Sequence, residues 1–201
     1  QAYLRVNGYF TVAEFPVVEA AGGGHRSLTD IDILAFRFPG AGREIGGPGR
    51  RTVNVEQHGP DAYLGRSGEE SDMLVGEVKE GRARLNRSAR DPAVLGAALV
   101  RFGCCSPAEA QRTVAELVRA GHVSTEAGHH IRMVVFGSSL DDEQEGEFTF
   151  VPLGHVVEFL QTHLTEHWEL VRHVQTKEPV LGFLLTLEKA RRAREASSTD
   201  S

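Results

Sequence analysis

Two apolar runs of the chain carry charged side chains at a spacing that suits chemistry on a strand. Asp30 and Asp32 lie within one run, and Glu77 and Lys79 lie at the end of another. Side chains two residues apart on a β-strand point to the same side of the sheet, so each pair shares a face. A carboxylate among apolar residues needs a cation, hydrogen bonds or exposure at a strand end, because its desolvation alone is strongly unfavourable. The spacing therefore predicts a polar site built on two strands.

The residue types at this site favour magnesium. If the two strands are neighbours, Asp32, Glu77 and Lys79 converge at one end of the sheet, and the backbone carbonyl of Val78 adds a further oxygen. Mg²⁺ prefers hard oxygen ligands and keeps several waters, which leaves positions for a phosphate and a nucleophilic water. Lys79 is then expected to orient or deprotonate that water and to stabilise charge in the transition state. The predicted chemistry is phosphodiester hydrolysis.

These residues resemble a known family. The stretches from Thr29 to Leu34 and from Gly76 to Lys79 are similar to the two signature elements of the PD-(D/E)xK nuclease superfamily, and the resemblance covers roughly residues 1–137. It implies an α/β protein with a restriction-endonuclease-like αβββαβ core, in which helices flank a mixed central sheet. Two features depart from the family pattern: no Pro-Asp dipeptide precedes the first carboxylate, and the insertion between the two strands is long.

The resemblance also implies roles for individual residues. Asp32 and Glu77 are the expected metal ligands, together with the carbonyl of Val78, and Lys79 is the expected catalytic lysine, while the role of Asp30 stays open. The implied cofactor is Mg²⁺, with Mn²⁺ as a substitute ion, and the implied partner is DNA. The expected function is a metal-dependent endonuclease in restriction, repair or defence. The alternative is a nuclease-like binding or regulatory module of a larger assembly, with weak or no catalysis.

A basic segment follows the Glu-x-Lys element. Arg82, Arg84 and Arg87 are predicted to contact nucleic acid, because arginine binds phosphate in a bidentate fashion. A solvated basic loop that balances Glu80 is an equal alternative. Asn86, in the same segment, is interpreted as a turn residue that could instead orient a phosphate or a metal-bound water. The net charge of −6 makes binding through overall charge unfavourable, so any nucleic-acid surface is local.

The remaining pattern supplies the elements that position these residues. The core is expected over residues 1–152, with a loop insertion at 40–71, followed by a C-terminal helical extension at 153–195 and a disordered tail at 196–201. The extension is expected to pack on the core or to form a homodimer. Apolar periodicity and turn residues predict helices at 2–6, 92–102, 106–120, from 153 onward and at 180–194, and strands at 9–18, 29–38, 73–79, 131–136 and 148–151.

Composition places the chain among globular proteins. Hydrophobic residues make up 40% and charged residues 25%, and no apolar run reaches the twenty or so residues that a bilayer requires. No signal-peptide pattern is found at the start, so a cytoplasmic location without membrane contact is expected. Cys104 and Cys105 are adjacent and unsuited to a structural disulfide or a zinc site, which fits a reducing compartment.

Two weaker signals remain. The run from His163 to His167 has the form H-x-x-E-H and resembles the inverted zinc-peptidase motif, but its histidines flank the apolar stripe of a predicted helix, where partly buried histidine is the usual state. Glu14, on the first predicted strand, is a further candidate for the acidic site.

Overall fold

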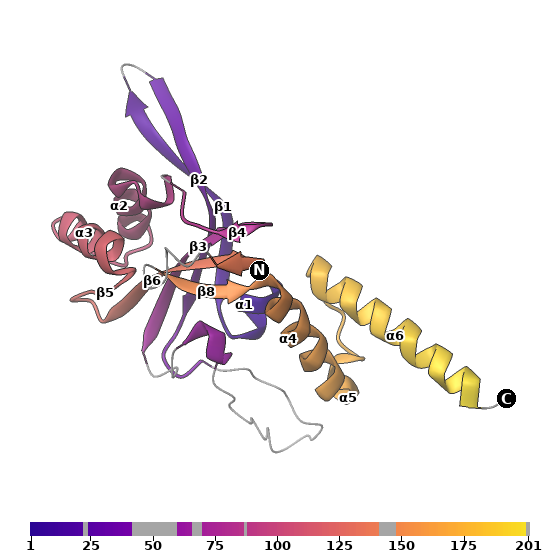
Figure 1. Cartoon of the computed structure of the whole chain (residues 1–201). Helices are drawn as coiled ribbons and strands as arrows, with labels where there is room; N and C mark the ends of the chain where they lie inside the picture. Colours follow the sequence, from indigo (N-terminus) through magenta and orange to yellow (C-terminus); the bar gives the residue numbers. More distant parts are fainter. Residues whose placement is uncertain (22–23, 42–59, 66–69, 87, 141–147, 200–201) are drawn as a thin grey trace.

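A mixed β-sheet forms the centre of the molecule, seen here in a computed structural model that describes residues 1–21, 24–41, 60–65, 70–86, 88–140 and 148–199. Its strands are β1 (Phe10–Ala21), β2 (Gly24–Arg37), β3 (Ser71–Val78), β5 (His122–Ser124), β6 (His129–Gly137) and β8 (Thr149–Pro152). The order is β1-β2-β3-β6-β5, and β8 also pairs with β6 (Figure 1). β1, β2 and β3 form an antiparallel meander, whereas β3 runs parallel to β6 and β6 parallel to β8.

Helices cover both faces of this sheet, and each face has its own apolar core. On one face, α2 and α3 bury residues such as Leu95 and Leu117 against Met73, Val75 and their neighbours. On the second face of the sheet, α1, the short helix η1 and α4 bury apolar side chains against β3 and β6. The bounds are α1 (Ala2–Val6), η1 (Ala62–Leu64), η2 (Ser88–Arg90), α2 (Pro92–Arg101), α3 (Ala110–Ala120) and α4 (Leu153–Glu166).

Local signals explain where α2 and α3 begin and end. Asp91 accepts a hydrogen bond from the N–H of Ala93 at 2.8 Å, which caps α2. Ser106 and Glu109 exchange the hydrogen bonds of a capping box, although the regular helix begins only at Ala110. Gly121, at φ 74°, ends α3 in the left-handed region. The helices predicted for this part of the chain are therefore confirmed, with a later start for α3.

The β1–β2 hairpin extends well beyond the sheet. Its strands pair from Phe10 opposite Phe36 to Ala21 opposite Gly24, with one register shift between Val17 and Val18. In Figure 1 its outer half rises above the body next to α2. A small parallel pair, β4 (Arg82–Ala83) with β7 (Ser139–Leu140), lies near the base of this hairpin.

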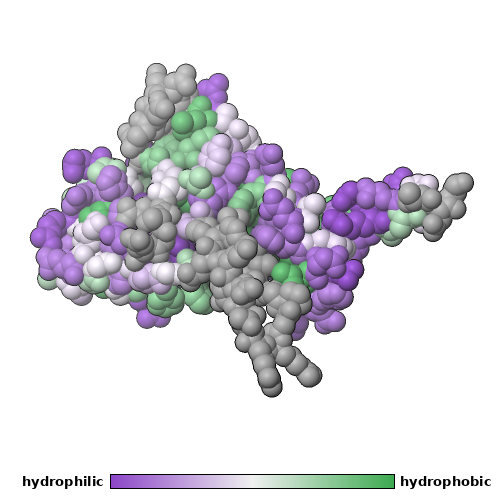
Figure 2. Space-filling model, turned by 90° about the horizontal axis from the view of Figure 1, so that it is seen from below, coloured by the Kyte–Doolittle hydropathy of each residue, from purple (hydrophilic) through white to green (hydrophobic). Residues whose placement is uncertain are grey.

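The C-terminal part contains α4, α5 (Trp168–Val171) and α6 (Pro179–Thr199). α4 belongs to the core because Leu160 is buried in the cluster beneath it. Helical spacing predicts that Val157 shares the apolar stripe of Leu160, but Val157 is 51% exposed, so this prediction is wrong. α6 extends from the body as a long arm (Figure 1), and its face in Figure 2 is mainly hydrophilic. The helix continues to Thr199, whereas a disordered tail was expected from residue 196.

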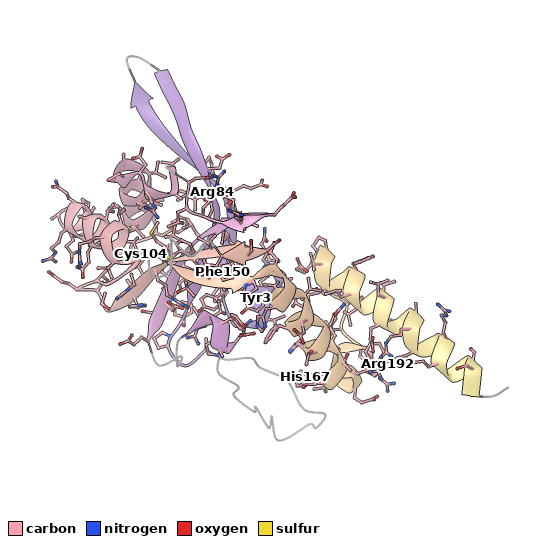
Figure 3. All side chains as sticks on the ribbon, in the orientation of Figure 1. Tyr3, Arg84, Cys104, Phe150, His167 and Arg192 are labelled. Carbon is pink, nitrogen blue, oxygen red and sulfur yellow. The ribbon has the colours of Figure 1, made fainter. Side chains whose placement is uncertain are left out.

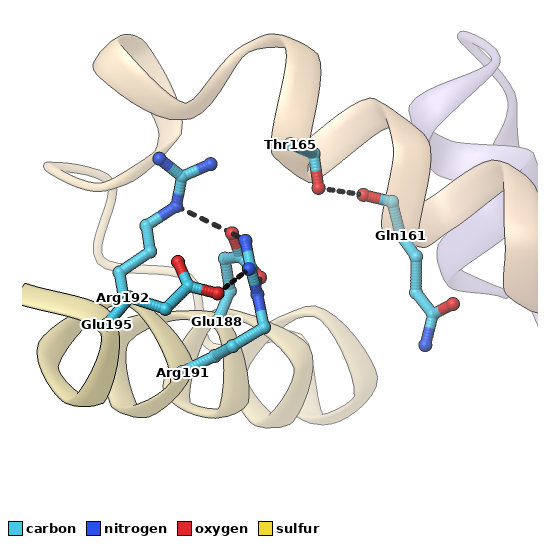
Figure 4. A network of polar contacts seen from close by, with 6 residues as sticks. All are labelled: Gln161, Thr165, Glu188, Arg191, Arg192 and Glu195. Atoms are coloured by element: carbon cyan, nitrogen blue, oxygen red, sulfur yellow. Dashed lines mark hydrogen bonds and ion pairs between the residues drawn. The ribbon is translucent and has the colours of Figure 1, made fainter. Parts of the chain in front are cut away.

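Ion pairs between side chains one turn apart stabilise the projecting helix α6. Arg191 binds both Glu188 and Glu195, and Arg192 binds Glu188 at 2.6 Å, one turn away in each case (Figure 4). Hydrogen bonds from Arg191 lower the pKa of Glu188 to about 2. Arg192 also lies over the ring of Trp168 at 4.6 Å, which connects α6 to α5.

The α/β class with a mixed central sheet between helices agrees with the sequence prediction. Of the insertion at 40–71, residues 42–59 and 66–69 lie outside the described residues, and the remainder contains η1 and the start of β3. Among the described residues, none of the helices combines the length and the apolarity needed to cross a membrane.

Candidate functional site

The two predicted carboxylates meet where β2 and β3 separate. The strands pair as far as Ile33 opposite Gly76, so one residue further along the ladder Asp32 comes opposite Glu77. Oδ2 of Asp32 accepts a hydrogen bond from the backbone N–H of Val78 at 2.8 Å. This bond extends the contact between the strands by a side chain after their backbone pairing has ended. Both acids therefore lie at one end of the sheet, on the face covered by α2.

Lys79 joins the same cluster. Its ammonium forms an ion pair with Oε1 of Glu77, and the Lys79 side chain is 22% exposed, so it remains in contact with solvent. Its backbone N–H donates to the carbonyl of Phe136 at 2.8 Å, which fixes the chain to β6 just beyond β3. Asp32, Glu77 and Lys79, predicted to be neighbours from their spacing, are brought together by the structure.

Asn86 completes the surroundings of Glu77. Its side-chain amide donates to Oε1 of Glu77, the oxygen that also binds Lys79. The sequence favoured a turn role for Asn86, with orientation of a phosphate or a metal-bound water as the alternative, and neither prediction included the contact with Glu77. The contact between Asn86 and Glu77 could have been suspected from the sequence, because Asn86 lies on the segment that follows the end of β3.

Glu77 is a carboxylate in a demanding environment. Only 5% of the residue is exposed, and the β3 residues on the same face, Met73 and Val75, belong to the apolar core. Burial raises the pKa of Glu77, the charge on Asp32 raises it further, and the hydrogen bond and charge of Lys79 oppose the shift without cancelling it. A divalent cation between Asp32 and Glu77 would relieve this repulsion.

Glu14 approaches the site from β1, which pairs with the other edge of β2. Because Ala13 pairs with Ile33 and Phe15 with Ile31, Glu14 comes opposite Asp32. Its φ of 52° makes it the one non-glycine residue with positive φ in the part of the chain that the structure describes. Such a conformation is uncommon for a side chain of this type and occurs often at functional sites. Glu14 is exposed, so its carboxylate is open to solvent near Asp32.

Asp30 lies one step back on β2 and is exposed. It lines a small pocket of about 10 Å³, together with Glu77, Leu85 and apolar residues of β3 and β6. That volume is on the order of a single water site. Asp30 thus borders the acidic cluster without being part of the Asp32–Val78 contact.

The donor set fits a hydrated magnesium ion better than a fully protein-bound metal. Asp32 and Glu77 supply hard carboxylate oxygens, and Val78, which follows Glu77, supplies a backbone carbonyl. Within the described ranges, no group of three or more His, Cys, Asp or Glu side chains is arranged to hold a metal. Mg²⁺ commonly binds through one or two carboxylates plus substrate phosphate and waters, so two acids are sufficient.

The predicted phosphate contacts divide into two groups. Arg82 and Arg84 are exposed and lie on or just after β4, and Figure 3 shows Arg84 beside that strand. Arg87 lies outside the described residues. The two described arginines are therefore on the segment that leads from Lys79 to Asn86, close in sequence to the acidic cluster.

The two cysteines and the histidines of the H-x-x-E-H run lie away from the acidic cluster in sequence, and burial disfavours reactivity of the cysteines. Cys104 and Cys105 are buried and unpaired by disulfide, and burial raises the pKa of Cys104 to about 11, which disfavours its thiolate. His163 and His167 lie on α4 and just beyond it, with ring centroids 4.8 Å apart.

Comparison of the chain with protein-family models, with curated proteins and with solved structures finds no significant match in any of the three. The site must therefore be interpreted from its own geometry.

Proposed function

We propose that this protein is a Mg²⁺-dependent nuclease with a restriction-endonuclease-like core of the PD-(D/E)xK type, hydrolysing phosphodiester bonds of DNA. The observation that carries the proposal is the convergence of Asp32, Glu77 and Lys79 at the end of two adjacent strands, with Asp32 hydrogen-bonded to Val78. Supporting it is the order of elements, in which a helix precedes a three-stranded meander and a further strand lies parallel to β3.

Each side chain has a role in this proposal. Asp32 and Glu77 hold the ion, with the Val78 carbonyl as a further oxygen, and Asn86 keeps the Glu77 carboxylate oriented. A bound Mg²⁺ supplies Lewis-acid polarisation of the phosphoryl oxygen and lowers the pKa of a coordinated water. Lys79, partly exposed beside Glu77, positions the attacking water and neutralises charge that develops on the phosphate. Arg82 and Arg84 bind the neighbouring backbone phosphates.

One observation favours the second candidate, a nuclease-like binding or regulatory module without strong catalysis. Oε1 of Glu77 binds both Lys79 and Asn86, and Oδ2 of Asp32 binds Val78, so these oxygens already have partners from the chain itself. A catalytic site needs these contacts to rearrange when the ion and DNA bind. The two candidates differ in whether cleavage occurs.

The deciding experiment is cleavage of supercoiled plasmid and of linear DNA by the full chain, with Mg²⁺, with Mn²⁺ or with EDTA. Lys79→Ala is expected to lower the cleavage rate by about 10²-fold to 10⁴-fold, the range for loss of a group that assists proton transfer. Lys177→Ala is the matched control, because Lys177 is an exposed lysine distant in sequence from the site.

The two variants separate the candidates. Metal-dependent cleavage that Lys177→Ala retains and Lys79→Ala loses, while both keep the wild-type melting temperature, supports the nuclease. Absence of cleavage by the wild type under all metal conditions, with DNA still bound, supports the binding module. Cleavage that survives in Lys79→Ala contradicts the assignment of the site.

A further inference from the structure

A second polar pocket lies on the opposite face of the sheet from the acidic cluster. Strand β6 pairs with β5 through residues 130–132 and with β8 from Val134 onward, and the pocket opens where the neighbour changes. Its volume is about 290 Å³. The lining residues that matter for binding are Gly65, His122, His130, Arg132, Phe148 and Thr149.

Arg132 provides the charge at this pocket. Its side chain is only 5% exposed, and Asp72 binds it in a bidentate manner, with Nε at 3.0 Å from Oδ1 and Nη2 at 2.8 Å from Oδ2. Tyr9 donates a hydrogen bond to the same carboxylate. These contacts fix the guanidinium plane, so the position of its remaining nitrogen is fixed in advance of any ligand.

That remaining nitrogen, Nη1, lies at the pocket wall. A Cβ added to Gly65 would lie 3.9 Å from it, and both residues line the pocket. Nη1 has no protein acceptor among the residues that the structure describes. A buried, oriented guanidinium with a free donor at a cavity is suited to an oxyanion.

The other lining groups agree with an anionic ligand. Among the lining residues that the structure describes there is no Asp or Glu, although the chain as a whole carries a net charge of −6. Nδ1 of His122 lies 3.0 Å from the carbonyl of Ala120 and therefore carries the proton, which leaves Nε2 as an acceptor for a protonated phosphate oxygen. The hydroxyl of Thr149 adds a further donor, and Phe148 gives the pocket an apolar wall.

The pocket is separate from the candidate nuclease site. Asp72, which holds Arg132, and Glu77 are five residues apart on β3, so alternation places them on opposite faces. From these observations we infer that this pocket binds the phosphate group of a small phosphate monoester, held by Nη1 of Arg132 with the hydroxyl of Thr149 as an additional donor. The apolar wall at Phe148 makes a nucleoside monophosphate the preferred source of the group over free phosphate.

The test is calorimetric titration of the full chain in EDTA, first with inorganic phosphate and then with adenosine monophosphate. The absence of divalent cation keeps ion-dependent binding at the acidic cluster from contributing. His122→Glu places a negative charge at an exposed position of the pocket and is expected to weaken binding at least tenfold. Thr149→Val, which keeps the shape of the side chain and removes its hydroxyl, is expected to weaken binding several-fold.

His173→Glu is the matched control, because it makes the same change at an exposed histidine that does not line the pocket. Binding that His173→Glu retains and both pocket variants lose supports the inference. Tighter binding of the monophosphate than of phosphate identifies the nucleoside form, and equal binding identifies the phosphate group alone. No binding of either probe to the wild type, or equal loss in His122→Glu and His173→Glu, overturns the inference. Lys79→Ala should bind both probes like the wild type, so the nuclease proposal can fail without affecting this one.

Discussion

The side chain of Asp32 accepts a hydrogen bond from the backbone N–H of Val78 at 2.8 Å, and so attaches one acid of the site to the residue between Glu77 and Lys79. A single contact thereby sets the relative position of the groups contributed by β2 and β3. It also constrains which substitutions are informative, because a change that loses the hydrogen bond alters the strand ends as well as the charge.

Asp32→Asn is expected to lower metal-dependent cleavage by about 10²-fold or more, the size of effect found when one electrostatic group acting on the transition state is removed. The amide oxygen can still accept the hydrogen bond from Val78, so the melting temperature should stay near that of the wild type. Asp30→Asn is the matched control on the same strand and should have a clearly smaller effect, because Asp30 does not make the Val78 contact. Equal losses in the two variants would contradict the assignment of Asp32.

Glu77 makes the stability of the metal-free protein depend on pH. Burial and the charge on Asp32 raise its pKa in the folded state, so the folded chain holds this proton more tightly than the unfolded chain. Stability from this group is therefore present below the unfolded pKa, which is about 4.3, and is lost as pH rises through the raised folded value. Glu77→Gln removes this titration and is expected to gain stability relative to the wild type as pH rises from about 4 through the raised folded pKa.

Urea unfolding in EDTA across this pH range measures the effect, and Glu80→Gln serves as the control because Glu80 is exposed. A wild type that gains stability over Glu77→Gln as pH rises would show that the sign is wrong. Addition of Mg²⁺ should raise the melting temperature of the wild type and of Glu80→Gln, but not of Glu77→Gln, because an ion that binds only the folded state stabilises it.

Much of the site follows from local spacing in the sequence. The two-residue period of a strand is sufficient to place Glu77 and Lys79 together, and the apolar runs around Asp32 and Glu77 predict the two strands. Their pairing as neighbours follows from the short list of topologies in which consecutive strands lie side by side. The contacts of Asn86 with Glu77 and of Val78 with Asp32 depend on where each strand ends, which periodicity does not determine.

The pairing of distant segments could not be predicted in the same way. Asp72 and Arg132 are sixty residues apart, and each lies within an apolar strand where a lone charge gives no indication of its partner. Their contact arises from the register of β3 against β6, in which Leu74 pairs with Arg132 and Asp72 with His130. The exposure of Val157 could not be predicted either. Helical spacing indicates that Val157 shares a face of α4 with Leu160, but it does not indicate how much of that face the rest of the protein covers.

Gly76 tests how closely β2 must approach β3. A Cβ at this position would lie 2.4 Å from Cγ2 of Ile33, a branch methyl with little freedom to move. Gly76→Ala is therefore expected to destabilise the protein by about 1–3 kcal/mol, the usual cost of overpacking, and to reduce cleavage because Glu77 is the next residue. Gly81→Ala, where an added Cβ meets nothing within 4 Å, should change neither property. Urea unfolding and the plasmid assay measure both, and wild-type stability in Gly76→Ala would contradict the close approach.

Arg84 tests whether DNA lies along the segment between Lys79 and Asn86. Its exposed guanidinium is expected to bind one backbone phosphate, so Arg84→Ala should weaken binding of unrelated DNA sequences to a similar extent and reduce the slope of log affinity against log salt by about 1. Fluorescence anisotropy at several salt concentrations, on a Lys79→Ala background that prevents cleavage, measures the slope. Arg119→Ala removes another exposed arginine, from α3, and should leave the slope unchanged, which excludes an effect of net charge. If both substitutions change the slope equally, phosphate contact is a property of the whole surface rather than of this segment.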